Sequence, residues 1–237
     1  PPRSMRQAED MITNTCDSML GAGFNCNDEC AGLHVHIDFS DHRHDFKMIA
    51  RLFRTMYAIE DIVYASLRSD RQNNTYCVPL KKGYSFSDVK VKMARDEMLR
   101  KYYKVQDAKT LILNDKSPNY GTRYNGLNLH SIMYRGTVEF RHHEGSLDSK
   151  EIIQWVSLLL QVVDYSINHY DKVQVVRILK AKTNMEKFKR TCKFLKLKKE
   201  TKDYLKERIA KNNPEFFDKP TVLKFQEMTI PNGNQQN

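Results

Sequence analysis

Hydrophobic and polar residues alternate in three short stretches of the chain, strictly at residues 33–39 and less regularly at 126–132 and 137–142. In the first, apolar residues from Leu33 to Phe39 alternate with His34, His36 and Asp38. A period of two is typical of a β-strand with one buried face, so each stretch is predicted to be a strand. The last two stretches lie close together in the sequence, which favours a hairpin or neighbouring antiparallel strands.

A second pattern, with apolar residues at helical spacing, predicts helices at 5–20, 46–68, 91–104 and 150–169. Asp41 or Asp45 is expected to cap the second helix, and Asp148 or Ser149 the last. Glu151 is placed to complete a capping box. Because residues 150–169 are apolar nearly all round, that helix should be central and buried. Residues 69–90 and 114–125 are polar and turn-rich, so we expect loops, with 69–90 on the surface.

Together these elements predict an α+β fold in which helices cover one face of an antiparallel sheet and leave the other face open. The polar positions of all three strands would then share that open face. They are His34, His36, Asp38, Asn128, Glu139 and Arg141. Such convergence suggests a functional site.

Composition places limits on the class of protein. A hydrophobic content of 40% fits a globular protein and is too high for a disordered chain. No apolar run approaches the roughly 20 residues that a membrane span needs, and the start PPRSMRQAED lacks the pattern of a secretory signal. We therefore expect a cytoplasmic protein with no membrane partner. The five cysteines include Cys26 and Cys30, a poor half of a zinc site, and are interpreted as reduced thiols.

The net charge of +10 is concentrated late in the chain. Residues 172–211 contain 15 Lys or Arg against 4 Asp or Glu, so the remainder of the chain is close to neutral. This predicts a first domain at 1–170 and a Lys-rich helical extension at 171–237. The extension is a candidate surface for nucleic acid or an acidic protein, and the alternative is a solvated helix pair packed on the domain.

The residue types on the predicted open face suit phosphate chemistry. Hard cations such as Mg²⁺ prefer carboxylate oxygens and phosphates, and a guanidinium binds a carboxylate or phosphate through two hydrogen bonds. The simpler alternatives are solvent-facing histidines and a cross-strand ion pair between Glu139 and Arg141. The sequence has no glycine-rich phosphate loop, so any nucleotide would be held by side chains and a metal on the sheet.

Four segments in this order resemble the amidoligase family of phages and bacteria. They are CAGLHVHIDFSD, SDRQNNTYCVPL, RYNGLNLHSI and GTVEFRHHEGSLDSKEIIQW, within roughly residues 1–170. That family is similar to glutamine synthetase and the glutamate–cysteine ligases. The resemblance implies a glutamine-synthetase-like sheet and an ATP-dependent carboxylate–amine ligase that forms an amide through an acyl phosphate. It also implies a carboxylate and an amine as substrates, and a location in the cytoplasm or, for a phage protein, the host cytoplasm or virion.

The resemblance also assigns expected roles to individual residues. His34 and Glu139 would bind Mg²⁺, and His36 and Asn128 would lie toward the ATP. Arg141 would bind the substrate and Arg123 would stabilise phosphoryl transfer, in which positioned positive charge does most of the work.

One feature of the family is not seen near the start of this sequence, namely a strand with paired glutamates of the E-x-E kind that completes the metal site. Two expectations follow. Either an upstream portion supplies that strand, or the metal site is incomplete and the protein is not an enzyme.

Two other functions stay open at this point. The first is a non-catalytic phage or virion component that keeps the fold and uses its basic segment to bind nucleic acid or an acidic partner. The second is a zinc hydrolase with His34, His36, His42 and His44 as ligands, which lacks a matched carboxylate and ranks last.

Overall fold

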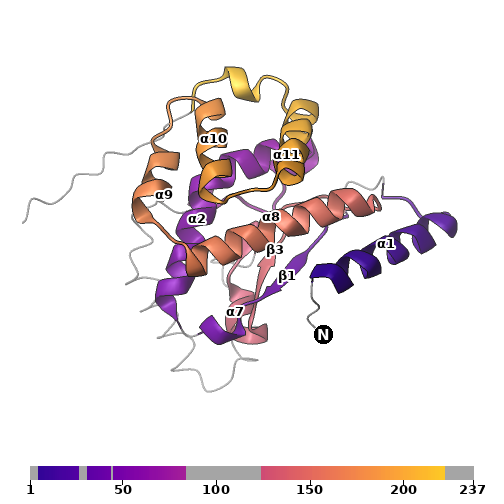
Figure 1. Ribbon diagram of the computed structural model, residues 1–237. Helices are drawn as coiled ribbons and strands as arrows, with labels where there is room; N and C mark the ends of the chain where they lie inside the picture. Colours follow the sequence, from indigo (N-terminus) through magenta and orange to yellow (C-terminus); the bar gives the residue numbers. More distant parts are fainter. Residues whose placement is uncertain (1–4, 27–30, 44, 84–123, 222–237) are drawn as a thin grey trace, which may run out of the picture.

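The computed structural model describes residues 5–26, 31–43, 45–83 and 124–221. It is α+β, as predicted: helix-rich, with an antiparallel sheet of three strands in the order β1-β3-β2. Strand β1 is Val35–Asp38, β2 is Leu127–Asn128 and β3 is Thr137–Phe140. The central strand β3 therefore pairs with both others, and Figure 1 shows β1 and β3 side by side beneath the helices.

Long helices make up most of the described chain. Their bounds are α1 Met5–Gly21, α2 Phe46–Ala65, α8 Ser149–Asn168, α9 Lys172–Leu179, α10 Asn184–Phe194 and α11 Lys199–Asn212. Short helices are α3 Ser69–Gln72, α4 Leu80–Gly83 and α7 His130–Arg135, with 3₁₀ turns at Ser40–His42 and Phe216–Asp218. None of the helices described combines the length and the apolar character needed to cross a membrane.

The predicted caps of the two long central helices are present. Asp45 caps α2 by accepting the N–H groups of residues 47 and 48, and Asp148 caps α8 through those of residues 150 and 151. The capping box was wrong, because Ser146 Oγ, and not Glu151, accepts the N–H of Asp148. The Glu151 side chain turns into the protein instead, where it contacts the last long helix.

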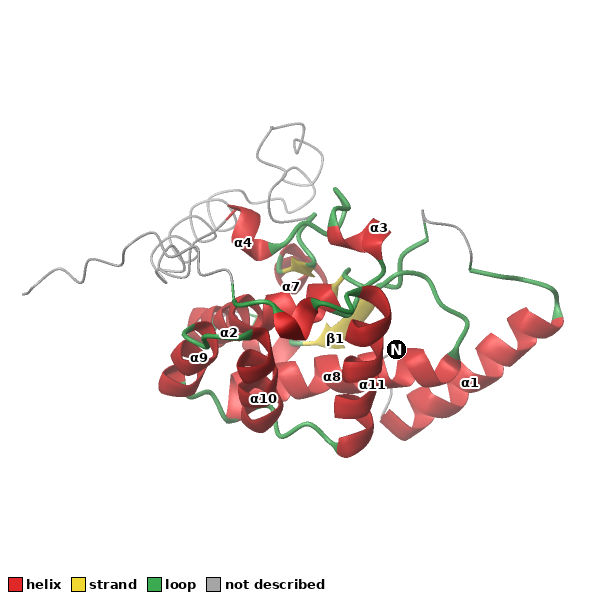
Figure 2. Ribbon diagram, turned by 90° about the horizontal axis from the view of Figure 1, so that it is seen from above, coloured by secondary structure: helices red, strands yellow, loops and turns green. Residues whose placement is uncertain are grey.

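The hydrophobic core lies between the sheet and the two central helices. Ile37, Val138 and Phe140 point from the strands toward α2 and α8, and Trp155 of α8 is fully buried there. Figure 2 shows α2 and α8–α11 on one side of the sheet and α3, α4 and α7 on the other. Within the described residues, the long helices therefore cover the apolar face of the strands, and short helices and loops border the polar face, which we call the open face.

The basic helices belong to the same core. Phe188 and Cys192 of α10, with Leu195 just after it, and Leu205 and Ile209 of α11 are buried in one cluster with α2 and α8. The predicted apolar stripe of the basic segment therefore packs inward.

The four cysteines within the described residues, Cys16, Cys26, Cys77 and Cys192, are all free thiols.

The prediction of a strand through residues 126–132 was wrong beyond Asn128. The chain turns into α7 at His130, and that helix ends at Gly136, which adopts a left-handed conformation with φ 71°. A short apolar run fits a strand or a helix by its periodicity alone. The two strands are antiparallel neighbours as predicted, with a helical turn as their connection.

The prediction of a surface loop at 69–90 was also wrong for its first part. Arg71, Cys77 and Leu80 are buried, and α3 and α4 lie within this segment. Val78 forms a parallel bridge with Asn125, which adds the segment to the edge of the sheet beside β2. The predicted helix at 91–104, residues 84–90, most of the loop at 114–125 and Arg123 lie outside the described residues.

Candidate functional site

The polar face of the sheet brings its predicted residues into two adjacent rows. In the first row His36, Glu139 and Asn128 lie side by side across the three strands. His34 and Arg141 are each two residues away on the same face and lie one step along. The alternation in the sequence thus placed five polar side chains on one surface.

Glu139 is the centre of this group, which we call the Glu139 cluster. Its Oε1 lies 3.1 Å from His34 Nδ1 and 3.0 Å from Arg141 Nη1, and His36 Nε2 is 3.8 Å away. Its Oε2 accepts a hydrogen bond of 2.6 Å from Asn128 Nδ2. The two histidines are exposed whereas Glu139 is 7% exposed, so the cluster opens to solvent on the histidine side.

Glu139 is ionised at neutral pH. Burial acts to raise its pKa, but hydrogen bonds from His34 and Asn128 and the positive charge of Arg141 outweigh burial and lower the pKa to about 2. The site therefore presents a permanent carboxylate beside a permanent guanidinium.

His36 is held by hydroxyl groups behind it. Its Nδ1 lies 3.0 Å from Thr137 Oγ1 and 3.5 Å from Ser131 Oγ, and these two hydroxyls are 3.0 Å apart. Its Nε2 is left facing Glu139. Burial lowers the pKa of His36 in spite of the nearby carboxylate, so the neutral imidazole is favoured.

Arg141 is oriented by a segment that strand alternation did not include. Its Nε donates to the carbonyl of Tyr76 at 3.0 Å. Buried Arg71 donates to the carbonyls of Arg141 at 2.7 Å and His142 at 3.2 Å, which holds the end of β3 in place. The SDRQNNTYCVPL segment was one of the four that resemble the amidoligase family, which could have pointed to a role near the site. Its polar composition instead led to the prediction of a surface loop.

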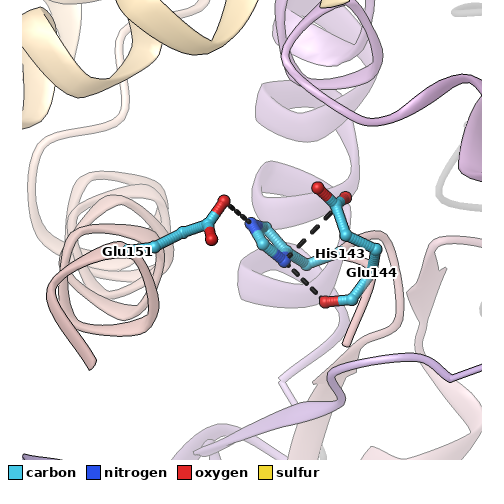
Figure 3. Close-up of side chains that lie close together, drawn as sticks. All are labelled: His143, Glu144 and Glu151. Carbon is cyan, nitrogen blue, oxygen red and sulfur yellow. Dashed lines mark hydrogen bonds and ion pairs between the residues drawn. The ribbon is translucent and has the colours of Figure 1, made fainter. Parts of the chain in front are cut away.

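A second ionic cluster lies just beyond β3, and we call His143, Glu144, Glu151, Tyr204 and Arg208 the α11 clamp. Figure 3 shows His143 between Glu144 and Glu151. His143 Nδ1 lies 2.7 Å from the carbonyl oxygen of Glu144, and its Nε2 is 3.1 Å from Tyr204 Oη and 3.6 Å from Glu151 Oε1. Arg208 of α11 forms ion pairs with both Glu144 and Glu151. Burial opposes ionisation of Glu144, but His143 and Arg208 lower its pKa.

The α11 clamp has the residue types of a metal site. One ligand atom from each of His143, Glu144 and Glu151 lies within 4.8 Å of the others. However, the guanidinium of Arg208 already contacts both carboxylates and supplies the positive charge that a cation would bring. The arrangement is therefore that of a structural ion-pair network, in which buried charges are satisfied by one another.

His142 lies between the two clusters in sequence but in neither in space. It is fully buried, with its ring against Tyr64 and Trp155 at centroid distances of 5.3 and 6.1 Å. Burial lowers its pKa to about 3, so it is a neutral residue of the core. The ionisable side chains of residues 139–144 thus lie in three places. Glu139 and Arg141 lie on the open face, His142 lies in the core, and His143 and Glu144 belong to the α11 clamp.

Two of the remaining predicted residues, Asp38 and His42, do not join the Glu139 cluster. Asp38 accepts the N–H of Ser40 at the end of β1. His42 packs against Phe39, with ring centroids 5.5 Å apart, and His44 lies outside the described residues, as does Arg123. The roles assigned to the clustered residues stay predictions, and the structure provides their arrangement.

Comparison with known proteins supports the resemblance noted in the sequence. Searches of curated proteins and of solved structures found no match. Residues 1–163 match the family model described as "Putative amidoligase enzyme", which includes β1, β2, β3 and every residue of the Glu139 cluster. The match covers more than half of the 237 residues, and the chain belongs to this amidoligase family.

Proposed function

We propose that the protein is an ATP- and Mg²⁺-dependent carboxylate–amine ligase that works on the open face of a glutamine-synthetase-like sheet. The observation that carries the proposal is the Glu139 cluster: an ionised carboxylate held at once by an imidazole, an amide and a guanidinium. Membership of an amidoligase family supports ligase chemistry. The α+β architecture, in which the described long helices pack on one face of an antiparallel sheet, is compatible with the proposed sheet.

The residues of the cluster fit a magnesium ion bound together with a nucleotide. Mg²⁺ in such sites takes one or two carboxylates and completes its shell with phosphates and water. Glu139 offers the carboxylate, His34 lies beside it, and the neutral imidazole of His36 is available on the same side. When bound, the metal would neutralise phosphate charge during phosphoryl transfer.

The protein's own residues would position the reactants. Arg141, fixed by Glu139 and by the carbonyl of Tyr76, presents a guanidinium for the substrate carboxylate or the transferred phosphate. Asn128 and Glu139 hold each other in place, so the negative charge stays at one point of the face. His36 keeps its Nε2 forward because Thr137 and Ser131 engage its Nδ1.

The proposed reaction has two steps. A substrate carboxylate oxygen attacks the γ-phosphorus of ATP, and ADP leaves with the electrons of the broken P–O bond. An amine nitrogen then attacks the acyl carbon, phosphate leaves, and the nitrogen loses a proton to give the amide. The substrates we propose are an amino acid, peptide or protein carboxylate and a primary amine.

The test is ADP release with Mg²⁺ across a panel of amino acids and peptides, by native protein and by Glu139→Gln. We expect the variant to lose at least about 100-fold in turnover, because a charged group that acts on phosphoryl transfer is worth several kcal/mol. Its far-ultraviolet circular dichroism should be unchanged, since the substitution removes charge and keeps volume. Glu200→Gln, on the exposed face of α11, is the matched control and should retain turnover.

A binding measurement separates metal and nucleotide binding from the identity of the substrate. Titration with a non-hydrolysable ATP analogue should show Mg²⁺-dependent binding to the native protein and weaker binding to Glu139→Gln. Equal binding by the two proteins would exclude Glu139 as a metal ligand. Retained turnover in the variant would reject the proposal itself.

A further inference from the structure

The basic segment, residues 172–211, consists of two parts that differ in net charge. Residues 172–199 contain 11 Lys or Arg and one acid, Glu186, whereas residues 200–211 contain 4 against 3. The excess charge therefore belongs to α9, α10 and the turns that join them to α11. We call residues 172–199 the α9–α10 surface.

Most cations of this surface face solvent. The exposed residues are Lys172, Arg177, Lys180, Lys182, Lys189, Lys193, Lys196, Lys198 and Lys199. The single acid is already engaged, because Glu186 forms an ion pair with Arg190. Lys187 is the exception among the cations, since it is buried and paired with Asp61 of α2. The outward charge is thus almost free of internal compensation.

The apolar side chains of the same segment point the other way. Val175, Ile178, Phe188 and Cys192 are buried in the core, so the lysines are fixed on the outside of a folded helix pair. Among the large apolar side chains of residues 172–199, Val173 is the one that is well exposed, at 59%. A protein partner would normally need aromatic or aliphatic anchors at the centre of its interface. A phosphate backbone needs only positive charge.

We propose that the α9–α10 surface binds the phosphate backbone of nucleic acid without sequence preference. Lysines contact phosphates and carry little base information, and the nine exposed cations offer no aromatic platform for bases. Figure 2 shows α9 and α10 on the helical side of the sheet, whereas the strand pairing places the Glu139 cluster on the opposite, polar face. The binding is therefore independent of the proposed ligase reaction, which it goes beyond.

The experiment uses the full chain and fluorescence anisotropy of a labelled 20-base-pair duplex of mixed sequence, from 50 to 300 mM salt. The test variant replaces Lys182, Lys189 and Lys193 by Gln. The control variant replaces Lys150, Lys206 and Lys211, which are equally exposed but lie on α8 and α11. Both variants lose three charges, so only the location of the charge differs.

We expect native protein to bind with an affinity that falls steeply with salt and is similar for two unrelated sequences. The test variant should lose at least about tenfold in affinity at 100 mM salt, and its slope of log K against log salt should be lower by about 2 to 3. The control should change less than threefold. The variant Glu139→Gln should bind the duplex as the native protein does, whatever its effect on ATP turnover.

Three results would overturn the proposal. They are undetectable binding at 50 mM salt, equal losses in the test and control variants, and binding to poly-L-glutamate of the same charge that is as tight as binding to the duplex. The last result would assign the surface to an acidic protein instead.

Discussion

Glu139 and Glu144 stand five residues apart in the same stretch, and each lies beside a histidine and an arginine, yet they have different tasks. Glu139 lies on the open face, and the side chains of its partners His34 and His36 are 38% and 32% exposed. Glu144 is enclosed with a histidine that is 1% exposed and with Arg208 from a distant helix. The same residue types therefore make a surface that can receive a ligand in one place and a closed structural joint in the other.

The difference teaches that the degree of enclosure decides what an ionic cluster can do. Charges taken out of water must be paired within the protein, and in the α11 clamp Arg208 already pairs with both carboxylates on a side closed to solvent. A half-exposed cluster keeps water on one side, which a metal, phosphate or carboxylate can displace. Two predictions test this contrast directly and one tests how burial acts on a single glutamate elsewhere, and they run from the largest effect to the smallest.

The first prediction concerns Arg208, the cation of the α11 clamp. Arg208→Met should lower the free energy of unfolding by about 3–5 kcal/mol, because buried Glu144 and half-buried Glu151 would both lose the cation that neutralises them. Arg190→Met is the control, since Arg190 pairs with Glu186 at the surface and should cost less than about 1 kcal/mol. Urea denaturation followed by circular dichroism measures both. Similar losses in the two variants would break the comparison.

The second prediction concerns Glu60, a buried glutamate of α2 that accepts the N–H groups of Leu80 and Lys81 at 2.6 and 3.0 Å. Burial raises its pKa from an ordinary value near 4.5 to about 7. The protonated form is therefore favoured in the folded state. Its contribution to stability should be complete below pH 4.5, decline between pH 4.5 and 7 and be absent above pH 7, with a total of at most about 3 kcal/mol.

Urea unfolding at intervals from pH 4.5 to 8 measures this contribution. Glu60→Gln should flatten the decline, whereas Glu200→Gln should leave it unchanged. A native curve that instead rises over this range would show that Glu60 is ionised in the fold.

The third prediction compares the two histidines directly. His143→Ala should lower the free energy of unfolding by about 2 kcal/mol. It removes hydrogen-bonding groups and the packing of the His143 ring against Trp155, whose ring centroids are 5.0 Å apart. His34→Ala should change stability by less than about 0.5 kcal/mol, as expected for an exposed side chain. On the proposed function, His34→Ala should weaken Mg²⁺-dependent nucleotide binding while His143→Ala leaves the affinity of the folded protein unchanged. The opposite assignment of the two losses would refute the contrast.

The sequence was informative where one local pattern determines the outcome. Strand alternation predicted that His34, His36, Asn128, Glu139 and Arg141 share a face, and residue type predicted the capping aspartates. These features depend on periodicity or on contacts within a few residues. The α+β class followed from the same patterns.

Features that depend on distant partners were missed. Arg71 was assigned to a surface loop, but it is buried because it donates to carbonyls of residues 141 and 142, some 70 positions later. Arg208 was counted among the cations of a basic segment, although it belongs to the interior. Composition alone does not distinguish a lysine-rich outer surface from the two cations, Lys187 and Arg208, that pair with acids of the preceding region.

The position of Arg208 in the chain has a consequence for synthesis. It is made 64 residues after Glu144 and lies beyond residue 163, where the match to the amidoligase family ends. As the chain leaves the ribosome, the strands of the open face and both central helices are made before α9, α10 and α11, which cover their remaining apolar surface. Domains fold as units and exposed apolar surface favours aggregation. A nascent chain or a fragment that stops at residue 163 would thus carry the whole Glu139 cluster and yet need a chaperone, or helices α9–α11 supplied as a separate peptide, to stay dispersed.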